Sequence, residues 1–180
     1  MLTQNKQQDN ISVLNKKYNL IQSAIDKTSQ SNTTILIANL CNNMNTFGAG
    51  FNKKIAEKFI AVKENYHMLG PTYIKNHVGH VQFVPVYRND KYRNEIVVAN
   101  MICQTGIISQ TNTRPLNYYY LGICLAKLQY YAKQYKAEKE LPVEIFFPKT
   151  QTKITGGNWS FVYDMIKDTL RKPTFTYVYE

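Results

Sequence analysis

Two segments of the chain combine the residue types and the position needed to bind phosphate. The first, residues 42–51 (NNMNTFGAGF), joins the apolar run 34–40 to a helical pattern over residues 54–62. A glycine-containing loop between a strand and a helix presents backbone N–H groups and the positive end of the helix dipole to an anion. Glycine also allows the backbone to approach a ligand closely. A single Gly-x-Gly is more often part of a structural turn, so this loop alone does not identify a phosphate site.

The second segment, residues 148–158 (PKTQTKITGGN), has the same placement. It follows the apolar run 142–147 and precedes a helical pattern over residues 159–170. The carboxyl ends of strands in a layered α/β fold are where ligands bind. Two such loops at the ends of separate strands therefore predict a site that holds a diphosphate between them.

The elements that position these loops follow from the hydrophobic pattern. The sequence predicts strands over residues 11–14, 34–40, 81–86, 95–102, 142–147 and 175–179, and helices over residues 20–28, 54–62, 116–136 and 159–170. The continuous apolarity of residues 34–40 is typical of a strand buried on both faces. Pro85 predicts an edge position or a bulge for its strand, which we expect to pair with residues 95–102 as a hairpin. Alternating strands and helices predict a layered α/β fold.

Length and composition predict one globular domain. The chain has 180 residues, and 44% of them are hydrophobic, which argues against wholesale disorder. No apolar run approaches the roughly 18 residues of a membrane span, and the polar first residues do not resemble a secretory signal. We expect a single domain over residues 1–180 with a frayed terminus at about residues 1–10.

Cysteine content and charge set further expectations. Cys41, Cys103 and Cys124 include no Cys-x-x-Cys pair, which argues against a disulfide framework and predicts reduced thiols in a cytoplasmic protein. The formal net charge of +10 predicts attraction to polyanions. Phosphorylated ligands and nucleic acid both remain open as partners, and a membrane is not expected.

The order of the motifs is more specific than either loop. Residues 34–51, 79–84 with 96–107, 115–118 and 147–159 resemble, in this order, the first phosphate loop, the central hairpin, the start of the next helix and the second phosphate loop of macro domains. They are most similar to the branch related to ADP-ribose-1″-phosphate phosphatases, which includes phage and bacterial proteins. The resemblance extends from Ile11 to Tyr179. It implies a three-layer α/β/α fold with a central mixed sheet and an ADP-ribose cleft at the strand ends.

Site residues follow from this resemblance. Asn42 would lie near the distal ribose and orient the attacking water if the protein is an enzyme. The residues implied to bind the diphosphate and ribose are Gly48, Ala49, Gly50 and Phe51 in the first loop and Thr150, Gln151, Thr152, Lys153, Ile154, Thr155 and Gly156 in the second. Asn19 would approach the adenine.

This sequence departs from the family pattern at several of these positions. Asn19 stands where the family usually has an Asp that binds the adenine amino group, and it keeps only a carbonyl acceptor. Gln151 and Lys153 replace loop glycines, so a side chain either blocks the backbone approach or, for Lys153, supplies a charge to a phosphate. Thr155 replaces an acidic residue of some hydrolytic members. Neither loop supplies the carboxylate expected of a general acid or base.

Other candidate sites are weaker. His77 and His80 form His-x-x-His without nearby carboxylates, so we expect no metal and no cofactor. His67 or His80 is an alternative general base, and Cys41 is more simply a buried thiol than a nucleophile. Three functions remain open: an ADP-ribose-1″-phosphate phosphatase or ADP-ribosyl hydrolase, a non-catalytic ADP-ribose-binding module, and a nucleic-acid-binding or structural derivative of the fold.

Overall fold

A computed structural model describes residues 10–15 and 18–180 of the chain, so nearly all of the terminus expected to fray lies outside the described residues. Within them, one mixed sheet has the strand order β1-β6-β5-β2-β4-β3. The strands are β1 (Ile11–Leu14), β2 (Thr34–Asn42), β3 (Val81–Asn89), β4 (Asn94–Gln104), β5 (Val143–Pro148) and β6 (Phe175–Tyr179). Neighbouring strands are parallel except for the antiparallel pair β3 and β4.

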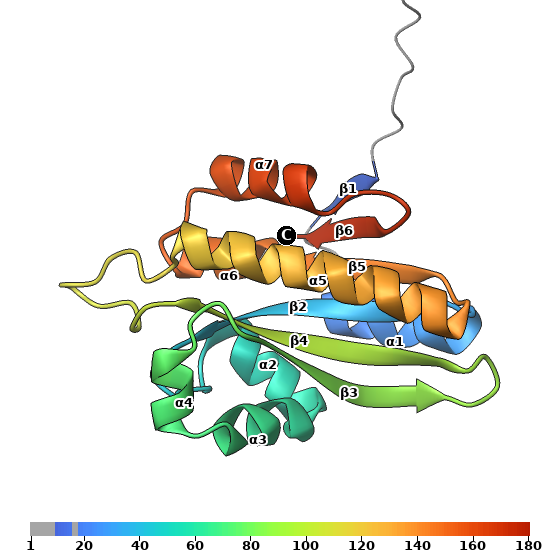
Figure 1. Ribbon diagram of the computed structural model, residues 1–180, viewed down its shortest axis with the longest axis horizontal. Helices are drawn as coiled ribbons and strands as arrows, with labels where there is room; N and C mark the ends of the chain where they lie inside the picture. The colour runs from blue at the N-terminus through green and yellow to red at the C-terminus, as the bar shows by residue number, and fades with distance from the viewer. Residues whose placement is uncertain (1–9, 16–17) are drawn as a thin grey trace, which may run out of the picture.

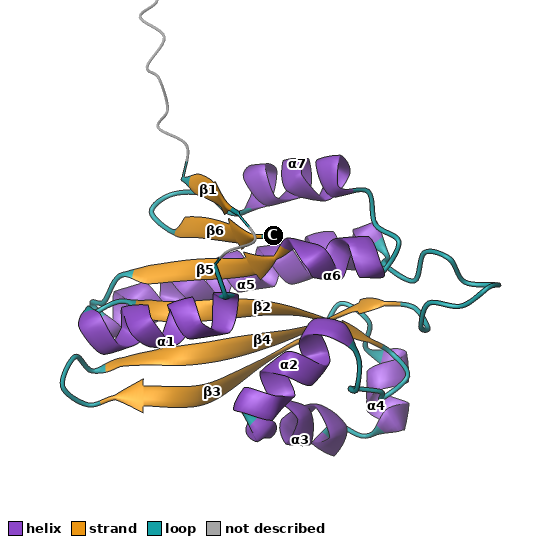
Figure 2. Ribbon diagram, turned by 180° about the vertical axis from the view of Figure 1, so that it is seen from behind, coloured by secondary structure: helices purple, strands orange, loops and turns teal. Residues whose placement is uncertain are grey.

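Helices cover both faces of this sheet. They are α1 (Leu20–Gln30), α2 (Gly50–Lys58), α3 (Ile60–Met68), α4 (Pro71–Asn76), α5 (Tyr118–Lys139), α6 (Lys149–Ile154) and α7 (Trp159–Thr169). Helix α5 lies along one face (Figure 1), and α1, α2 and α3 are seen on the other when the molecule is turned (Figure 2). The predicted three-layer α/β/α fold is confirmed.

The alternation of side chains along β2 divides the core between the two faces. Leu36 and Leu40 belong to the cluster beneath α5, whereas Ile35 and Ile37 belong to the cluster beneath α1 to α4. All four are completely buried, as expected for a strand that is covered on both faces. Each buried side chain of this size stabilises the fold by about 1.5–3 kcal/mol.

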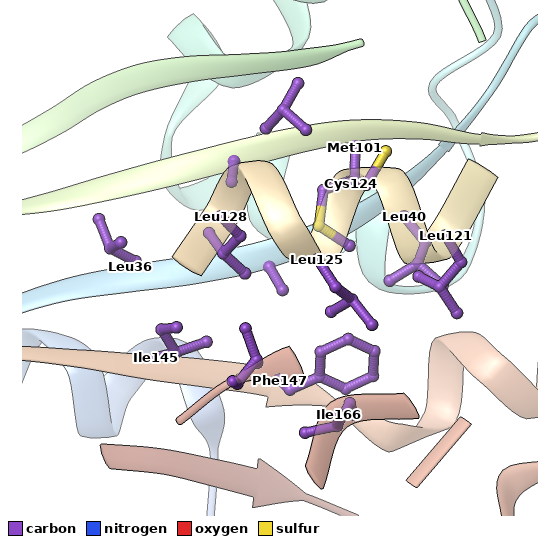
Figure 3. Packing of buried hydrophobic residues seen from close by; sticks show 14 of the residues in the cluster. Leu36, Leu40, Met101, Leu121, Cys124, Leu125, Leu128, Ile145, Phe147 and Ile166 are labelled. Atoms are coloured by element: carbon purple, nitrogen blue, oxygen red, sulfur yellow. The ribbon is translucent and has the colours of Figure 1, made fainter. Parts of the chain in front are cut away.

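Helix α5 contributes a regular apolar stripe to the first cluster. Leu121, Leu125 and Leu128 recur at helical spacing, are completely buried and pack toward β2, β4 and β5 (Figure 3). The helix begins at Tyr118 rather than at Leu116, because the side chain of Asn117 caps it by accepting from the N–H of Tyr120 (3.3 Å). This packing fixes α5 against the strands whose ends form the site.

The predicted hairpin of β3 and β4 is confirmed. β3 lies at one edge of the sheet, and the register shifts between Pro85 and Tyr87. Proline has no N–H to donate to a neighbouring strand, so it is tolerated at an edge and at a bulge.

The helices differ from the sequence-based prediction at three further places. Residues 149–154, predicted to be a loop, form α6. Helix α4, which has Pro71 at its first position, is not among the predicted helices. The helical pattern over residues 54–62 is divided between α2, which begins earlier at Gly50, and α3. Among the described residues, no helix is both long enough and apolar enough to span a membrane.

Candidate functional site

Two adjoining cavities open at the carboxyl ends of β2, β5 and β6. Cavity A, of about 350 Å³, lies between the end of β2, the following segment 46–52 and α6. Cavity B, of about 490 Å³, lies between the start of α1, helix α2 and the ends of β5 and β6. Phe51 lines both cavities, so they adjoin at this side chain. The two cavities therefore lie side by side at this end of the sheet.

The predicted site residues divide between these cavities. Cavity A is lined by Asn42, Gly48, Ala49, Gly50, Phe51, Gln151, Ile154 and Thr155, and cavity B by Asn19, Phe51 and Thr150. Thr152, Lys153 and Gly156 are not among the residues that line either cavity. Every site residue predicted in the first loop therefore lines a cavity, whereas only part of those predicted in the second loop do.

The first loop is shaped by the side chain of Asn42. Its Nδ2 donates to the backbone oxygen and to the hydroxyl of Thr46, both at 2.9 Å. Its Oδ1 accepts from the N–H of Met44 (2.9 Å) and from the hydroxyl of Tyr66 (3.2 Å). The Tyr66 hydroxyl lies closer to the Asn42 backbone oxygen, at 2.7 Å. Both ends of the Asn42 amide are thus used to fold the loop.

This loop leads directly into the N-terminus of α2, which faces cavity A. The first intrahelical hydrogen bond runs from the N–H of Lys53 to the oxygen of Ala49 (3.2 Å), so the N–H groups of Gly50, Phe51 and Asn52 precede it. Ala49 provides no side-chain cap. Uncapped N–H groups together with the helix dipole form a binding site for an anion.

Gly48 and Gly50 keep this approach open in different ways. A Cβ built on Gly48 meets nothing within 4 Å, so this residue borders open space. Gly50 has φ +55°, a left-handed conformation that side chains rarely adopt, and its Cβ would lie 3.5 Å from Cδ1 of Ile154. The backbone at Gly50 can therefore turn into α2 while remaining close to the opposite wall.

The opposite wall is a helix and not the glycine loop predicted from the sequence. The N–H groups that follow α6 bond within the chain: Thr155 to Gln151 O (3.1 Å), Gly156 to Lys153 O (3.1 Å) and Gly157 to Thr152 O (2.8 Å). This part of the second segment consequently contributes side chains to the lining of cavity A. The backbone N–H groups that could bind a ligand there are those at the N-terminus of α2.

The buried side chain of Gln151 accounts for the helical form of this wall. β5 pairs with β2 only as far as Ile37, so the backbone of Leu40 lies beyond the last strand pairing on that side. Gln151 Oε1 accepts from the Leu40 N–H (2.8 Å), and Nε2 donates to Asn39 Oδ1 (3.0 Å). The side chain is almost completely buried and replaces the peptide group of a longer strand.

We expect Gln151→Leu to lower the free energy of unfolding by about 1–3 kcal/mol, because it leaves the buried Leu40 N–H without an acceptor. Urea denaturation measures this loss. Lys153→Ala in the same helix is the matched control, since Lys153 is exposed, and it should change stability by less than about 0.5 kcal/mol. Equal stability of Gln151→Leu and the wild type would contradict the role assigned to Gln151.

Lys153 and Gly156 of the second segment lie away from the two cavities. Lys153 is exposed, and the neighbouring Ile154 lines cavity A instead. Gly156 packs against a distant loop: with φ +72°, its Cβ would lie 2.2 Å from the backbone oxygen of Thr113. A Cβ built on Gly157 would lie 2.6 Å from Cδ2 of Leu116. These glycines allow close packing between two parts of the chain.

The wall contributed by the end of β4 and the loop after it, which projects beyond the sheet (Figure 1), was not predicted from the sequence. Gln104, Ile107, Ile108 and Pro115 line cavity A, and Gln104 donates to the backbone oxygen of Leu40 (3.1 Å). Ile107 and Ile108 are about half exposed, so the mouth of this cavity is apolar. Because β2 and β4 pair in parallel, the carboxyl ends of both strands lie at this edge of the sheet.

The nucleophile and bases considered from the sequence lie away from the cavity linings. Burial raises the pKa of Cys41 well above its usual value, so its thiol stays protonated at neutral pH. His67 Nδ1 lies 2.8 Å from Asn45 Oδ1, and burial lowers the pKa of His80. Neither histidine lines cavity A or B. In the described part of the chain, no group of three metal-ligating side chains comes together.

Comparison with known proteins identifies the fold. No protein-family model and no curated protein sequence matches the chain. A solved structure of a protein of unknown function from Bacteroides thetaiotaomicron is similar with a TM-score of 0.73 at 22% identity, covering 94% of this chain and 98% of that one. A macrodomain protein from Streptomyces coelicolor is similar with a TM-score of 0.66 at 25% identity, covering 94% and 98%.

A further similar structure holds a ligand. Thermosipho africanus DarTG, in complex with ADP-ribose, is similar with a TM-score of 0.56 at 11% identity, covering 85% of this chain and 42% of that chain. Together with the six-stranded mixed sheet and its two helical layers, these similarities show that the chain has the macrodomain fold.

Proposed function

We propose that this chain is a macro domain that binds ADP-ribose or a closely related nucleoside diphosphate ribose. The observation that carries the proposal is the uncapped N-terminus of α2, which lies where cavities A and B adjoin. A diphosphate at this point would receive backbone N–H groups and the helix dipole, and it could extend a sugar into each cavity. The structural similarity to a protein that holds ADP-ribose supports the same ligand.

The resemblance orients the ligand within the two cavities. The diphosphate would lie along residues 48–51, the distal ribose would extend into cavity A toward Asn42, and the nucleoside would occupy cavity B. Lys54 and Lys58 line cavity B from α2 and are exposed. The formal net charge of the whole chain is +10, and these two lysines would attract an anionic nucleotide.

The lining of cavity A favours binding without hydrolysis. The described residues that line it include no carboxylate, histidine or lysine, so the lining supplies no side chain suited to act as a general acid or base. The Asn42 amide, predicted to orient a water, is already bonded at both ends. Hydrolysis of ADP-ribose-1″-phosphate or of ADP-ribosyl adducts, with Asn42 as the catalytic residue, therefore remains a separate prediction to be tested beside binding.

Isothermal titration calorimetry with ADP-ribose tests the proposal, and AMP and ribose 5-phosphate as separate ligands test whether both cavities contribute. Each fragment should bind more weakly than the whole ligand, because it occupies one cavity only. A phosphate-release assay with ADP-ribose-1″-phosphate then tests for hydrolysis. No heat with ADP-ribose, together with salt-dependent binding of an oligonucleotide, would favour a nucleic-acid-binding derivative of the fold.

A cytoplasmic location is part of the same proposal. It is supported by the three cysteines, which are all free and buried.

A further inference from the structure

A chain of side-chain amides leads from the wall of cavity A into the sheet. Gln151 accepts from the N–H of Leu40 and donates through Nε2 to Asn39 Oδ1 (3.0 Å). Asn39 Nδ2 in turn donates to Asn100 Oδ1 (2.9 Å), which brings the chain from β2 to β4. Asn39 and Asn100 are completely buried, and neither lines cavity A or B. The polar interior of the sheet is therefore bonded to the lining of cavity A.

The chain ends at the backbone of α3. Asn100 Nδ2 donates to the backbone oxygen of Val62 and to Gln82 Oε1, both at 3.1 Å. Gln82 Nε2 donates to the backbone oxygen of Asn65 (2.9 Å). Four side-chain amides, carried by α6, β2, β4 and β3, thus join α6 to α3 through the sheet.

Backbone groups at the two ends fix the orientation of every amide between them. The N–H of Leu40 can only donate, so it requires the oxygen of Gln151. The carbonyl of Asn65 can only accept, so it requires the nitrogen of Gln82. Reversing one amide of the chain would place nitrogen against nitrogen on one side and oxygen against oxygen on the other. All members are therefore paired in one arrangement only.

The same chain reaches the N-terminus of α2 through Asn52. Gln151 Nε2 also donates to Asn52 Oδ1 (3.3 Å), and Asn52 Nδ2 donates to the backbone oxygen of Leu40 (3.3 Å). Asn52 lines cavity A, and its backbone N–H is one of the three that precede the first hydrogen bond of α2. The orientation of Gln151 consequently bears on the helix end where the proposed diphosphate binds.

We infer that Asn39 and Asn100 are positioning residues for the ligand site. They hold Gln151 in one orientation, and Gln151 together with Asn52 holds the first turn of α2 against β2 and α6. The backbone donors of α2 are then in place before a ligand arrives, so less conformational entropy is lost on binding. This inference rests on the proposed function, which places the diphosphate at α2.

Asn100→Ala removes the middle of the chain without changing a residue that lines either cavity. We expect it to weaken ADP-ribose binding by about 5-fold, because the side chains it releases must be ordered again when the ligand binds. Calorimetry measures the affinity, and urea denaturation checks that the variant is folded. A residue that only stabilises the fold would leave the affinity of the folded protein unchanged.

Asn94→Ala is the matched control. Asn94 is an equally buried asparagine of the same strand, but it donates to the backbone oxygens of Thr28, Ser31 and Thr33 near the amino end of β2. The control should lower the urea midpoint about as much as Asn100→Ala and leave the affinity for ADP-ribose unchanged. Equal affinities of the wild type and both variants would overturn the positioning role.

Gln82→Leu keeps the test decisive if Asn100→Ala does not fold, because Gln82 is only half-buried and lies on the edge strand β3. It should weaken binding by about twofold, since Val62 still accepts from Asn100 in this variant. Wild-type affinity in Gln82→Leu would then overturn the inference.

Hydrogen exchange of the Leu40 N–H, measured without ligand, separates this inference from the proposed function. Because Gln151 supplies the acceptor for this N–H, exchange should be faster in Asn100→Ala than in Asn94→Ala. If the wild type does not bind ADP-ribose, the proposed function is overturned, and the exchange comparison still decides whether the chain holds Gln151. If ADP-ribose binds with equal affinity to all variants, the positioning role is overturned and the proposed function stands.

Discussion

Gly48→Glu is expected to weaken ADP-ribose binding by about 100-fold while the fold remains intact. Two unit charges 4 Å apart near a protein surface repel by about 4 kcal/mol, and screening at this exposed position lowers the value to roughly that of a 100-fold loss. The substitution places a carboxylate in front of the α2 N-terminus, where the proposed diphosphate binds. Since a Cβ at Gly48 meets nothing within 4 Å, the side chain should be accommodated without strain. Calorimetry measures the affinity.

Gly48→Gln is the matched control, because it has the same size and shape without the charge. It should weaken binding by about tenfold or less, and the difference between the two variants should shrink in 1 M salt. Gly50 is less suitable for this experiment, since any side chain there is strained by its φ of +55°. Wild-type affinity in a folded Gly48→Glu variant would remove the α2 N-terminus from the site.

The layered fold and the first loop could be predicted because local patterns determine them. The apolar run in β2 is long enough to require cover on both faces, and β2 is indeed completely buried on both. Pro85 marks the edge strand through a property of its own backbone. In each case the physical cause lies within a few residues of its effect.

The second loop could not be predicted, because its glycines have a role that depends on distant residues. Gly156 and Gly157 precede a helix, as phosphate-binding glycines do, yet their missing side chains make room for Thr113 and Leu116. Likewise, Gln151 folds inward to bond with Leu40, more than a hundred residues away in the sequence. A single sequence shows which residues are present and leaves open which distant group each one meets.

The two asparagines of the site show the same limit at the level of single atoms. The sequence places Asn19 and Asn42 where the resemblance requires polar groups, and both line the cavities. It does not show that the Asn19 oxygen caps α1, or that the Asn42 amide is used within its own loop. Residue type therefore predicts position better than it predicts which atoms remain for a ligand.

Asn42→Ala is expected to weaken ADP-ribose binding by at least about tenfold and to lower the free energy of unfolding by about 1–3 kcal/mol. The reason is that Asn42 holds the backbone of residues 44–46 through both ends of its amide, and this backbone positions the α2 N-terminus. If the wild type releases phosphate from ADP-ribose-1″-phosphate, the rate should fall together with the affinity. Calorimetry, urea denaturation and a phosphate-release assay measure the three quantities.

Tyr66→Phe separates loop positioning from direct action on the ligand. The Tyr66 side chain is completely buried, is not among the residues lining either cavity, and donates to the backbone oxygen of Asn42 at 2.7 Å. Removing its hydroxyl loosens Asn42 without removing a ligand contact. The affinity for ADP-ribose should therefore fall as in Asn42→Ala, but by a smaller factor. A catalytic Asn42 predicts a different pattern: Asn42→Ala would lower turnover at least about 100-fold with a much smaller loss of affinity, because positioning the attacking water affects mainly the transition state. That result would contradict a binding module and establish the protein as a hydrolase that acts through Asn42.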